Sequence, residues 1–466
     1  MNFMNFINAA SPNYYTPYLS FTIAASLGWA VQLYPLPLPK FFYMLQLNFI
    51  RQNPEEIKKR LLQRNFSNIE LVDKIIALDE TVRKLKVEAE SLQATMNTAS
   101  KEIGMLMGKG EKELADVKKQ EVSKHKSSIQ QLNEQLSNTE MQLQDELVKL
   151  PNLPHSSVKM GKTPEENEVV KQVGEIPTLF DGAVPHWELI KKYNLVDFET
   201  GSKLTGSGFP LYKDKGAKLQ RALIQFFLDY NTEAGYTEYL PPLLVNEASA
   251  YGTGQLPDKE GQMYHVTADN LYLIPTGEVP VTNIYRDEII KEADLPIKMT
   301  AYTPCFRREA GSFGSDVRGL NRVHQFDKVE IIQFVHPEKS YTVLEQMVLH
   351  VEQLLQQLQL PYRILRLCGG DMGFTSALTY DFEVFSAAQQ KWLEVSSVSN
   401  FESFQCNRLK TRFKDSNGKT QLLHTLNGSS LALPRIVASL LENNQKPDSI
   451  DLPQVLHQYF GAASIN

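Results

Sequence analysis

The longest regular pattern of apolar positions covers residues 71–106, where hydrophobic side chains recur at alternating steps of four and three. Such a repeat is typical of a helix that packs along one side against a partner helix. Glycines follow at Gly104, Gly108 and Gly110, and a weaker apolar repeat resumes over residues 122–150. Since glycine favours turns, the pattern predicts an antiparallel helical hairpin whose turn lies at these glycines.

Two further segments flank this hairpin. Asn53, Pro54 and Glu56 have the spacing of an N-cap, a first helical residue and a capping-box partner, which predicts a short helix ahead of the hairpin. Residues 151–177 are polar and contain several prolines, a composition that predicts a linker into a second domain.

Beyond the linker, helix-like and strand-like patterns are mixed. Residues 216–232 carry apolar side chains at helical spacing, and a strand-like segment ends at Pro241 and Pro242. Residues 301–309 and 323–334 are two runs with few breaks in their apolar character, and the loop between them is rich in glycine, serine and charge. This arrangement predicts an antiparallel strand pair with a long polar tip.

Residues 1–43 differ from the rest of the chain because they are apolar and almost uncharged. The apolar run over residues 19–34 is short for a membrane span, and no Lys or Arg precedes Lys40 to form the positive part of a secretory signal. We therefore expect the functional protein to begin at Met44, and a membrane-associating leader is the alternative.

Length and composition limit the possible classes. The chain has 466 residues with ordinary fractions of apolar and charged side chains, so it has room for two or three domains and a large core. A net charge of −6 disfavours a generally cationic nucleic-acid binder, so any RNA contact must come from local patches. Cys305, Cys368 and Cys406 lie far apart in the sequence and predict neither a disulfide framework nor a zinc site.

Candidate chemistry lies on the predicted strand pair. Arg307 and Glu309 are at the end of the first strand, and Phe326 on the returning strand comes back beside them. A guanidinium group binds phosphate through two parallel hydrogen bonds, and an aromatic face suits a base, so this group predicts a nucleotide site. A solvated cross-strand ion pair is the alternative for the Arg and Glu side chains.

Several segments in one order resemble the class II aminoacyl-tRNA synthetases, and the seryl enzymes in particular. They are residues 235–242, similar to motif 1, residues 273–280, similar to the serine-binding loop, residues 306–330, similar to motif 2, residues 392–397, and residues 427–435, similar to motif 3. The resemblance implies an α+β fold with a mixed, mostly antiparallel sheet flanked by helices. It also implies a tRNA-binding coiled-coil arm over residues 44–155 and a catalytic domain over residues 156–466.

The activity that this resemblance implies is that of a serine–tRNA ligase. Serine and ATP would give seryl-adenylate and pyrophosphate, and the 3′-terminal ribose of tRNA(Ser) would then take the seryl group. The resemblance further implies a cytoplasmic homodimer with no membrane partner. It leaves open whether tRNA(Sec) is a second substrate.

For ATP, the resemblance implies binding by Arg307, Arg308, Glu309, Val323, Phe326, Glu394, Val395, Ser396, Ser397 and Arg435. Arg307 and Arg435 would be catalytic, with Arg307 at the α-phosphate and Arg435 at the γ-phosphate. Glu394 and Ser397 offer the hard oxygen ligands that Mg²⁺ prefers, and zinc is not expected. Because Leu393 and Val395 flank it, we expect Glu394 to be buried and to need a cation as its partner.

For serine, the resemblance implies contacts from Thr276, Gly277, Glu278, Glu330 and Ser429. We expect carboxylates to hold the ammonium group, and Glu330 and Ser429 to read the hydroxyl. A site that hydrogen-bonds this hydroxyl leaves its own groups unpaired when alanine enters. Two positions depart from the family pattern, since Asn321 replaces a usual apolar residue and Asp214 a common glycine. We interpret both as variation without a chemical role.

Two other classes of function compete with this interpretation. A ligase that loads an amino acid onto a carrier protein would share the catalytic fold, but the long arm and the lack of zinc-ligand cysteines count against it. A non-catalytic RNA-binding protein would not need Arg307, Glu309, Glu394 and Arg435. Candidates for RNA phosphate contacts, each with a solvated helix surface as the alternative, are Lys109, Lys112, Lys118, Lys119, Lys124 and Lys126.

Overall fold

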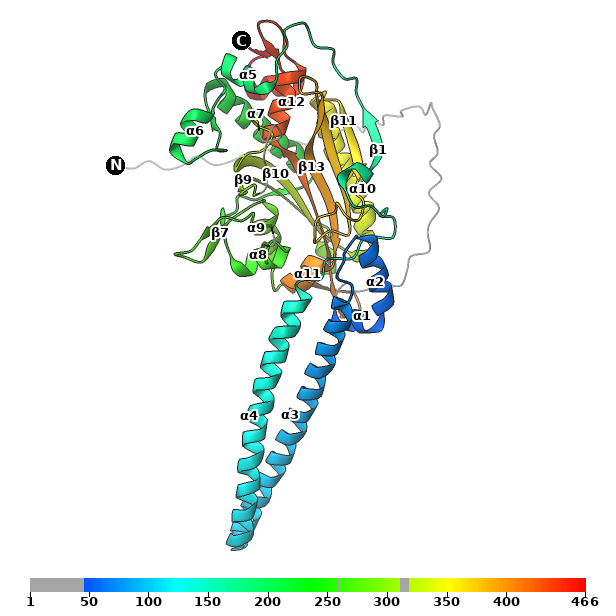
Figure 1. Cartoon of the computed structure of the whole chain (residues 1–466), viewed down its shortest axis with the longest axis vertical. Coiled ribbons are helices and arrows are strands. Elements are labelled where there is room, and N and C mark those ends of the chain that lie inside the picture. Colours follow the sequence, from blue (N-terminus) through cyan, green and yellow to red (C-terminus); the bar gives the residue numbers. More distant parts are fainter. Residues whose placement is uncertain (1–45, 259, 311–317) are drawn as a thin grey trace, which may run out of the picture. The chain divides into compact units, whose positions relative to one another are not determined.

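The computed structural model of the chain describes residues 46–258, 260–310 and 318–466, which belong to one unit (Figure 1). The expected leader, Met44 and the tip of the predicted strand pair at residues 311–317 lie outside the described residues. Within the described ranges, no helix is long and apolar enough to cross a membrane.

An eight-stranded sheet is the largest element of this unit. Its strands follow the order β1-β11-β12-β13-β16-β10-β9-β4, and neighbours are antiparallel except for β4 and β9. The strands are β1 Glu168–Val173, β4 Thr237–Glu238, β9 Ile297–Phe306, β10 Gln325–Val335, β11 Tyr362–Arg366, β12 Leu378–Ser386, β13 Lys391–Glu402 and β16 His424–Ala432. The expected mixed, mostly antiparallel sheet is confirmed. The predicted strand pair is β9 and β10, whose register places Cys305 opposite Phe326.

Helices and short strands complete the unit. The helices are α1 Leu47–Gln52, α2 Pro54–Gln63, α3 Leu71–Gly108, α4 Lys112–Leu147, α5 His186–Lys192, α6 Phe198–Leu204, α7 Asp214–Glu233, α8 Glu247–Thr253, α9 Glu278–Thr282, α10 Ser340–Gln357, α11 Phe404–Leu409, α12 Leu433–Asn443 and α13 His457–Phe460. The short strands are β2 Val196–Asp197, β3 Leu211–Tyr212, β5 Leu244–Asn246, β6 His265–Val266, β7 Leu271–Leu273, β8 Ile289–Lys291, β14 Arg412–Lys414, β15 Thr420–Leu422, β17 Ile450–Asp451 and β18 Ser464–Ile465.

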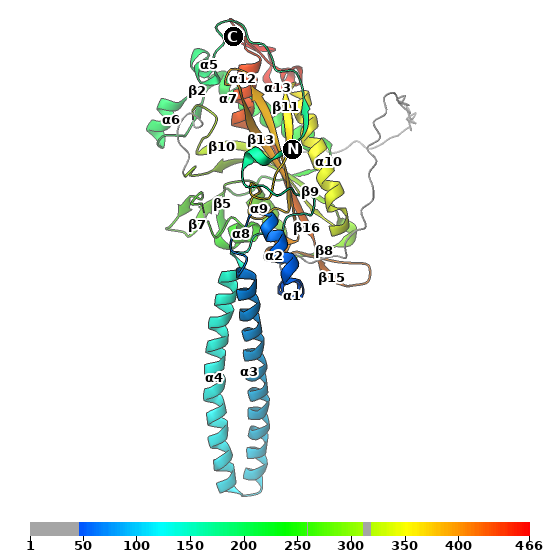
Figure 2. The ribbon, with the colours of Figure 1, turned by 45° about the vertical axis from the view of Figure 1, so that its right-hand side comes forward.

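The alternation of side chains along β10 separates an apolar core from a polar cavity. Helices α7, α10 and α12 lie against the sheet (Figure 2), and Val329 and Ile331 of β10 belong to the core that they share. Lys328 and Glu330 alternate with these residues, so they face the other side of the strand, where they line a cavity. One strand therefore supplies both rigid packing and charged groups.

The predicted helical hairpin is confirmed, since α3 and α4 are long helices that pack on each other. The turn between them is shorter than predicted, because α3 continues through Gly104 and α4 begins at Lys112. Gly110 has a positive φ of 81°, a conformation that glycine adopts without strain. Gly104 lies inside a helix, so contacts between the two helices outweigh its weak helix propensity.

Two predictions beside the arm need correction. Asn53 precedes α2 and Pro54 is its first residue, as predicted, but the Asn53 side chain does not cap the helix. Its Nδ2 instead donates to the Phe49 oxygen at 3.2 Å. The predicted linker is only partly irregular, because residues 168–173 form β1 at the edge of the main sheet. The side chains of β1 are mostly exposed, so its place depends on backbone pairing with β11, which apolar patterning cannot predict.

Arg64 anchors the base of the arm to the rest of the unit. It follows α2, is 6% exposed and donates to the backbone oxygens of Asn152, Met372, Gly373 and Ser376. Burial lowers the pKa of Arg64 to about 9, so its guanidinium stays protonated at neutral pH. A buried charge is tolerated only where hydrogen-bond partners replace water, and these four carbonyl groups supply them.

We expect Arg64→Ala to reduce the free energy of unfolding by about 3 kcal/mol, because it leaves several buried carbonyl oxygens without a donor. Urea denaturation at pH 7 measures this change. Lys59→Ala, on the exposed face of the same helix, is the matched control and should shift the unfolding free energy by less than about 0.5 kcal/mol. Equal midpoints for Arg64→Ala and the unsubstituted chain would contradict the anchoring role.

Candidate active site

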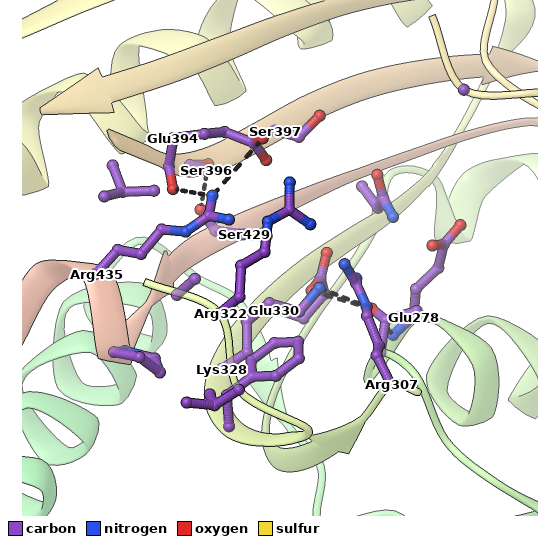
Figure 3. Close-up of a pocket in the computed structure, with 18 of the residues that line it drawn as sticks. Glu278, Arg307, Arg322, Lys328, Glu330, Glu394, Ser396, Ser397, Ser429 and Arg435 are labelled. Carbon is purple, nitrogen blue, oxygen red and sulfur yellow. Dashed lines mark hydrogen bonds and ion pairs between the residues drawn. The ribbon is translucent and has the colours of Figure 1, made fainter. Parts of the chain in front are cut away.

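A cavity of about 420 Å³ opens over the central strands of the large sheet (Figure 3). Its floor is formed by β10, β16 and β13, which are neighbours in the sheet and carry Glu330, Ser429 and Glu394. Thr276 before α9 and Glu278 at its start form one side, and Arg435 near the start of α12 forms another. Segments far apart in the sequence therefore meet at this cavity.

Lys328 connects the floor of the cavity to the segment before α9. Its Nζ lies 2.5 Å from Oε2 of Glu330 and donates to Oγ1 of Thr276 at 2.8 Å. The Thr276 hydroxyl lies 3.4 Å from the same Glu330 oxygen. The side chains of Lys328 and Glu330 are 8% and 2% exposed, so water screens their mutual attraction only weakly.

Glu278 is a second buried carboxyl group in this cavity. Burial, followed by repulsion from Glu330, raises the pKa of Glu278 to about 7. Gln405 Nε2 opposes this shift by donating to Oε1 of Glu278 at 2.6 Å. Burial also raises the pKa of Glu330, against the effect of the nearby Lys328 charge. Two buried carboxyl groups with raised pKa values in one cavity favour the binding of a cationic ligand, which would reduce the repulsion between them.

The opposite wall carries Glu394 and Arg435. Arg435 Nη1 donates to the backbone oxygen of Glu394 at 2.7 Å and lies 3.8 Å from its carboxylate. The prediction that Glu394 is buried is wrong, since its side chain is 51% exposed. Its neighbours Leu393 and Val395 enter the apolar core, and alternation along β13 turns Glu394 to the other face, where the cavity lies.

Arg307 and Phe326 lie together at the end of the strand pair. The Arg307 guanidinium is 5.3 Å from the centre of the Phe326 ring, and its Nε donates to the Pro275 oxygen at 3.2 Å. Glu309 forms an ion pair at 3.0 Å with Arg322, which is partly exposed. Arg307 therefore lines the cavity beside an aromatic ring, and Glu309 lines it as well while forming an ion pair with Arg322.

The cavity brings together most of the site residues expected from the sequence: Thr276, Glu278, Arg307, Glu309, Val323, Phe326, Glu330, Glu394, Val395, Ser396, Ser397, Ser429 and Arg435. Two of the expected residues do not line it. Arg308 is exposed, and its backbone N–H donates to the Gln262 oxygen. Gly277 is buried beside the cavity wall, where an added Cβ would lie 3.0 Å from Oγ1 of Thr303.

Several residues of this site were not predicted from the sequence. Lys328 precedes Glu330 by two positions on the same strand, so the period of a strand already placed both side chains on one face. Asn427 stands in the same relation to Ser429 on β16 and lines the cavity. Gln405 is 127 positions from Glu278, and no local signal links the two residues.

Oxygen donors lie on β13 and on its neighbour β12, and those of β13 line the cavity. Glu394 and Ser397 are on β13, and Asp381 lies opposite Ser397 on β12. The Oδ1 atom of Asp381 is buried without a hydrogen-bond partner, and burial, followed by repulsion from Glu394, raises its pKa well above the usual range. An unsatisfied buried oxygen beside two further oxygen donors suits a cation. Among the described residues, no cluster of three or more His, Cys, Asp or Glu side chains is arranged for a metal.

Two family models match the chain. The model of the seryl-tRNA synthetase N-terminal domain matches residues 44–154, and that of the tRNA synthetase class II core domain (G, H, P, S and T) matches residues 264–444.

Curated relatives and solved structures are similar over nearly the whole chain. The serine–tRNA ligase of Salinibacter ruber is 50% identical over 91% of this chain and 99% of its own length. That of Methanosarcina barkeri is 43% identical over 90% of this chain and 98% of its own. The crystal structure of seryl-tRNA synthetase from Pyrococcus horikoshii complexed with ATP superposes with a TM-score of 0.84 at 33% identity, over 91% of this chain and 99% of that one.

We expect Lys328→Met to reduce the free energy of unfolding by about 3 kcal/mol at pH 8 and by clearly less at pH 5. Loss of the ammonium group raises the pKa of Glu278 and Glu330 further above their unfolded value of about 4.5. A carboxyl group whose pKa is higher in the folded state than in the unfolded state loses stability as pH rises above the unfolded value, and without the Lys328 charge this loss is larger at pH 8 than at pH 5.

Urea denaturation at the two pH values tests this expectation. Lys328→Arg, which keeps the positive charge, should show a smaller difference between pH 5 and pH 8. A loss of the same size at both pH values in Lys328→Met would show that Lys328 acts through packing and not through its charge.

Proposed function

The chain belongs to the seryl-tRNA synthetase family and is a serine–tRNA ligase, and we propose that its cavity over β10, β16 and β13 activates serine with ATP. One observation supports the proposal that serine is activated in this cavity. Buried carboxyl groups that favour a cation, Glu278 and Glu330, share a single cavity with Arg307, Glu394 and Arg435, which suit a nucleotide and its metal. An amino acid and a triphosphate need these two kinds of environment side by side.

The reaction requires little proton transfer in its first step. A serine carboxylate is already ionised at neutral pH, so it can attack the α-phosphorus of ATP without a general base. Catalysis then depends on holding the two substrates in line and on stabilising the negative charge that develops on phosphate oxygens. We assign this second task to Arg307, whose guanidinium is fixed at the Pro275 carbonyl group and lies against the Phe326 ring.

We propose that serine lies over Glu330 and Ser429, which face each other across β10 and β16. Glu278 would hold the ammonium group, because a positive charge there offsets the burial and the repulsion from Glu330 that raise the pKa of this carboxyl group. Glu330 and Ser429 would bind the hydroxyl, so alanine would leave buried polar groups unpaired. Thr276 contributes through its hydrogen bond with Lys328, and Gly277 leaves room beside Thr303.

We propose that ATP occupies the rest of the cavity, between Phe326 and Arg435. Phe326 offers a ring for the adenine base beside Val323, and Glu309 lies close by for contacts to the nucleotide or the amino group. Arg435 would meet the γ-phosphate. Arg308, which the resemblance included in the ATP site, is left out of this assignment because its side chain does not line the cavity.

Glu394 and Ser397 would hold Mg²⁺, with phosphate oxygens completing its ligands. The fit rests on the donor set, since both side chains line the cavity and the neighbouring Asp381 has an unsatisfied buried oxygen. Magnesium commonly binds through one or two carboxylates and substrate phosphates. When bound, the ion neutralises charge on the triphosphate. The cofactor set that we propose contains no zinc.

We propose that the paired helices α3 and α4 bind tRNA(Ser) in the cytoplasm. The tip of this arm carries two kinds of lysine. Lys118 and Lys119 form ion pairs with acidic side chains of the arm, whereas Lys109 and Lys112 are exposed and have no ion-pair partner within the described residues. We assign phosphate contacts to the second pair. Because such an arm reads shape and backbone, we propose tRNA(Sec) as a second substrate.

We propose a homodimer that forms along β4, one edge of the large sheet. Apolar side chains are exposed beside this strand, with Leu240 87% exposed and Ile289 60% exposed. Ile289 also lines an open groove with Tyr239 and Ile284. Contiguous exposed apolar groups of this kind mark protein–protein contacts. We further propose that residues 44–155 form the tRNA-binding arm and residues 156–466 the catalytic domain, so that residues 44–466 suffice for function.

Serine-dependent pyrophosphate exchange tests the site. We expect the chain to exchange pyrophosphate with serine in preference to the other amino acids, and Arg307→Ala and Glu394→Ala each to reduce the rate by at least about a hundredfold, because both act on charge at the phosphates. Arg308→Ala is the control and should remain near the original rate. Near-normal exchange by either of the first two variants, when folded, would refute its assigned role.

The arm is tested by comparing two reactions. Lys109→Ala combined with Lys112→Ala should weaken tRNA binding and lower the slope of log affinity against log salt by roughly one per lysine, because fewer phosphates are neutralised. Pyrophosphate exchange should be unchanged. Lys119→Ala, whose ammonium group lies 2.7 Å from Asp116, is the control. An unaltered salt dependence in the double variant would remove these lysines from the interface.

Gel filtration with light scattering tests the dimer in a chain that contains residues 44–466. This chain should exchange pyrophosphate as fast as the full chain and elute as a dimer, whereas Leu240→Asp should elute as a monomer because a charge cannot be buried there unpaired. Leu204→Asp, at a leucine that is 68% exposed on α6, should stay dimeric. Loss of exchange on removal of residues 1–43 would instead assign them a role in the functional protein.

A further inference from the structure

Helix α5 holds the segment that leads into β10. His186 Nε2 accepts a hydrogen bond from the Leu320 N–H at 2.9 Å, and the Arg318 guanidinium lies 4.5 Å from the centre of the Trp187 ring. Gly319 approaches this helix so closely that an added Cβ would lie 2.4 Å from His186 Nε2. Residues 318–320 are therefore held by α5, and Leu320 lines the cavity together with Asn321 and Arg322, which follow it.

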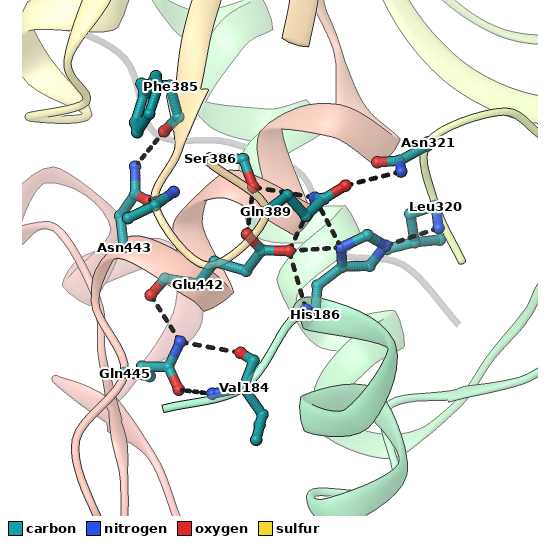
Figure 4. Close-up of polar contacts among 11 residues, drawn as sticks. Val184, His186, Leu320, Asn321, Phe385, Ser386, Gln389, Glu442, Asn443 and Gln445 are labelled. Carbon is teal, nitrogen blue, oxygen red and sulfur yellow. Dashed lines mark hydrogen bonds and ion pairs between the residues drawn. The ribbon is translucent and has the colours of Figure 1, made fainter. Parts of the chain in front are cut away.

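The buried carboxylate of Glu442, on α12, accepts hydrogen bonds from His186, which contacts residues 319 and 320, and from two other side chains (Figure 4). Because a backbone N–H can only donate, the Leu320 contact leaves the His186 proton on Nδ1, which donates to Oε1 of Glu442 at 2.7 Å. The Ser386 hydroxyl donates to the other carboxylate oxygen. Gln389 Nε2 donates to Oε1 at 2.8 Å. These donors satisfy a carboxylate that would otherwise be costly to bury.

The Gln389 amide links this buried carboxylate to the cavity wall. Its nitrogen is directed to Glu442, so its oxygen is free to accept from Asn321 Nδ2, at 2.8 Å. The backbone oxygen of Asn321 accepts from Arg435 Nε at 3.0 Å. A continuous path of hydrogen bonds therefore runs from Glu442 through Gln389 and Asn321 to Arg435.

Arg435 depends on this path for its orientation. Its Nε and Nη1 donate to two backbone oxygens, those of Asn321 and Glu394. Asn321 lies in the loop before β10, and Glu394 lies on β13. Its Nη2 has no partner among the residues that the structure describes, and the side chain lines the cavity. A guanidinium group held by two of its nitrogens presents the third in one direction, at a lower entropy cost on binding an anion.

We propose that Asn321 and Gln389 are positioning residues for ATP, which hold the cavity wall so that Arg435 is oriented towards the nucleotide. This inference rests on the proposed ATP site. It replaces the interpretation of Asn321 as variation without a role, since the side chain that departs from the family pattern is 4% exposed and forms the contact with Gln389. Neither residue needs to touch ATP for this effect.

The Asn321–Gln389 hydrogen bond can be tested with variants, because leaving one buried partner unpaired costs more stability than removing both partners. Asn321→Leu leaves the Gln389 oxygen unpaired, and Gln389→Leu leaves the Asn321 amide unpaired and removes a donor from Glu442. Replacing both partners by apolar groups can be almost neutral, because no buried polar group of the pair remains unsatisfied. The double variant should therefore recover part of the stability that each single variant loses.

The experiment measures pyrophosphate exchange at varied ATP and varied serine, together with calorimetric binding of ATP in the absence of serine. We expect each single variant to raise the KM and Kd for ATP by about fivefold to tenfold and to leave the KM for serine within about twofold. In Asn321→Leu with Gln389→Leu, the melting temperature should return closer to that of the original chain than in Asn321→Leu alone, whereas the constants for ATP should stay raised because the path to Arg435 is still broken.

Gln333→Leu is the matched control. It also removes a buried amide of β10, which donates to the Tyr236 hydroxyl at 2.7 Å, but this residue does not line the cavity. Gln333→Leu should lower the melting temperature and leave the KM for ATP unchanged. Single variants of Asn321 and Gln389 that behave in the same way would overturn the proposal, as would equal increases in the KM for ATP and serine.

The two hypotheses fail in different ways. If the original chain binds ATP but does not exchange pyrophosphate with serine, the proposed serine site is wrong, while ATP binding by the variants still tests the positioning role. If exchange with serine is normal in the original chain and ATP binding is the same in all variants, only the positioning role is wrong.

Discussion

Burial of two carboxyl groups in one cavity is the constraint on which this site depends. Burial raises the pKa of both Glu278 and Glu330, and repulsion from Glu330 raises the pKa of Glu278 further. Lys328 offsets part of these effects by contacting Glu330 and Thr276 at once. A cation bound between the carboxyl groups would offset more. The cavity is thus an environment that gains stability from binding an ammonium group, which is a physical basis for selecting an amino acid.

Rigid support lets the protein maintain this unfavourable arrangement. β10 alternates between the apolar core and the cavity, so Val329 and Ile331 hold the strand in place while Lys328 and Glu330 face the site. The same alternation on β13 places Leu393 and Val395 in the core and leaves Glu394 open to the cavity. A well-packed sheet fixes the spacing between charges that would otherwise move apart.

The side of the cavity that we propose for ATP is supported differently. Arg435 is held by backbone oxygens, and one of these belongs to a segment that α5 and the buried Glu442 restrain. Backbone acceptors impose direction without adding another charge to the cavity, so the free nitrogen of the guanidinium keeps its attraction for a phosphate. The arm is a separate element whose base is fixed by neutral carbonyl groups around Arg64.

The sequence by itself determined the elements and the chemical groups available to them. A repeat over residues 71–106 requires a helix with a partner, and the order of motifs identified residues such as Arg307, Glu330 and Arg435 before their positions were known. Lys328 could also have been found, because the period of a strand places it beside Glu330.

Only the tertiary structure decided which groups meet. Nothing local to Gln405 indicates that it donates to Glu278, and nothing local to Asn321 indicates that it contacts Gln389. The edge strand β1 was mispredicted for the same reason. The exposure of Glu394 was mispredicted for another reason, since its apolar neighbours on β13 belong to the opposite face of the strand. Periodicity records which face of an element is apolar, whereas contacts between distant residues depend on strand order and register, which no local pattern contains.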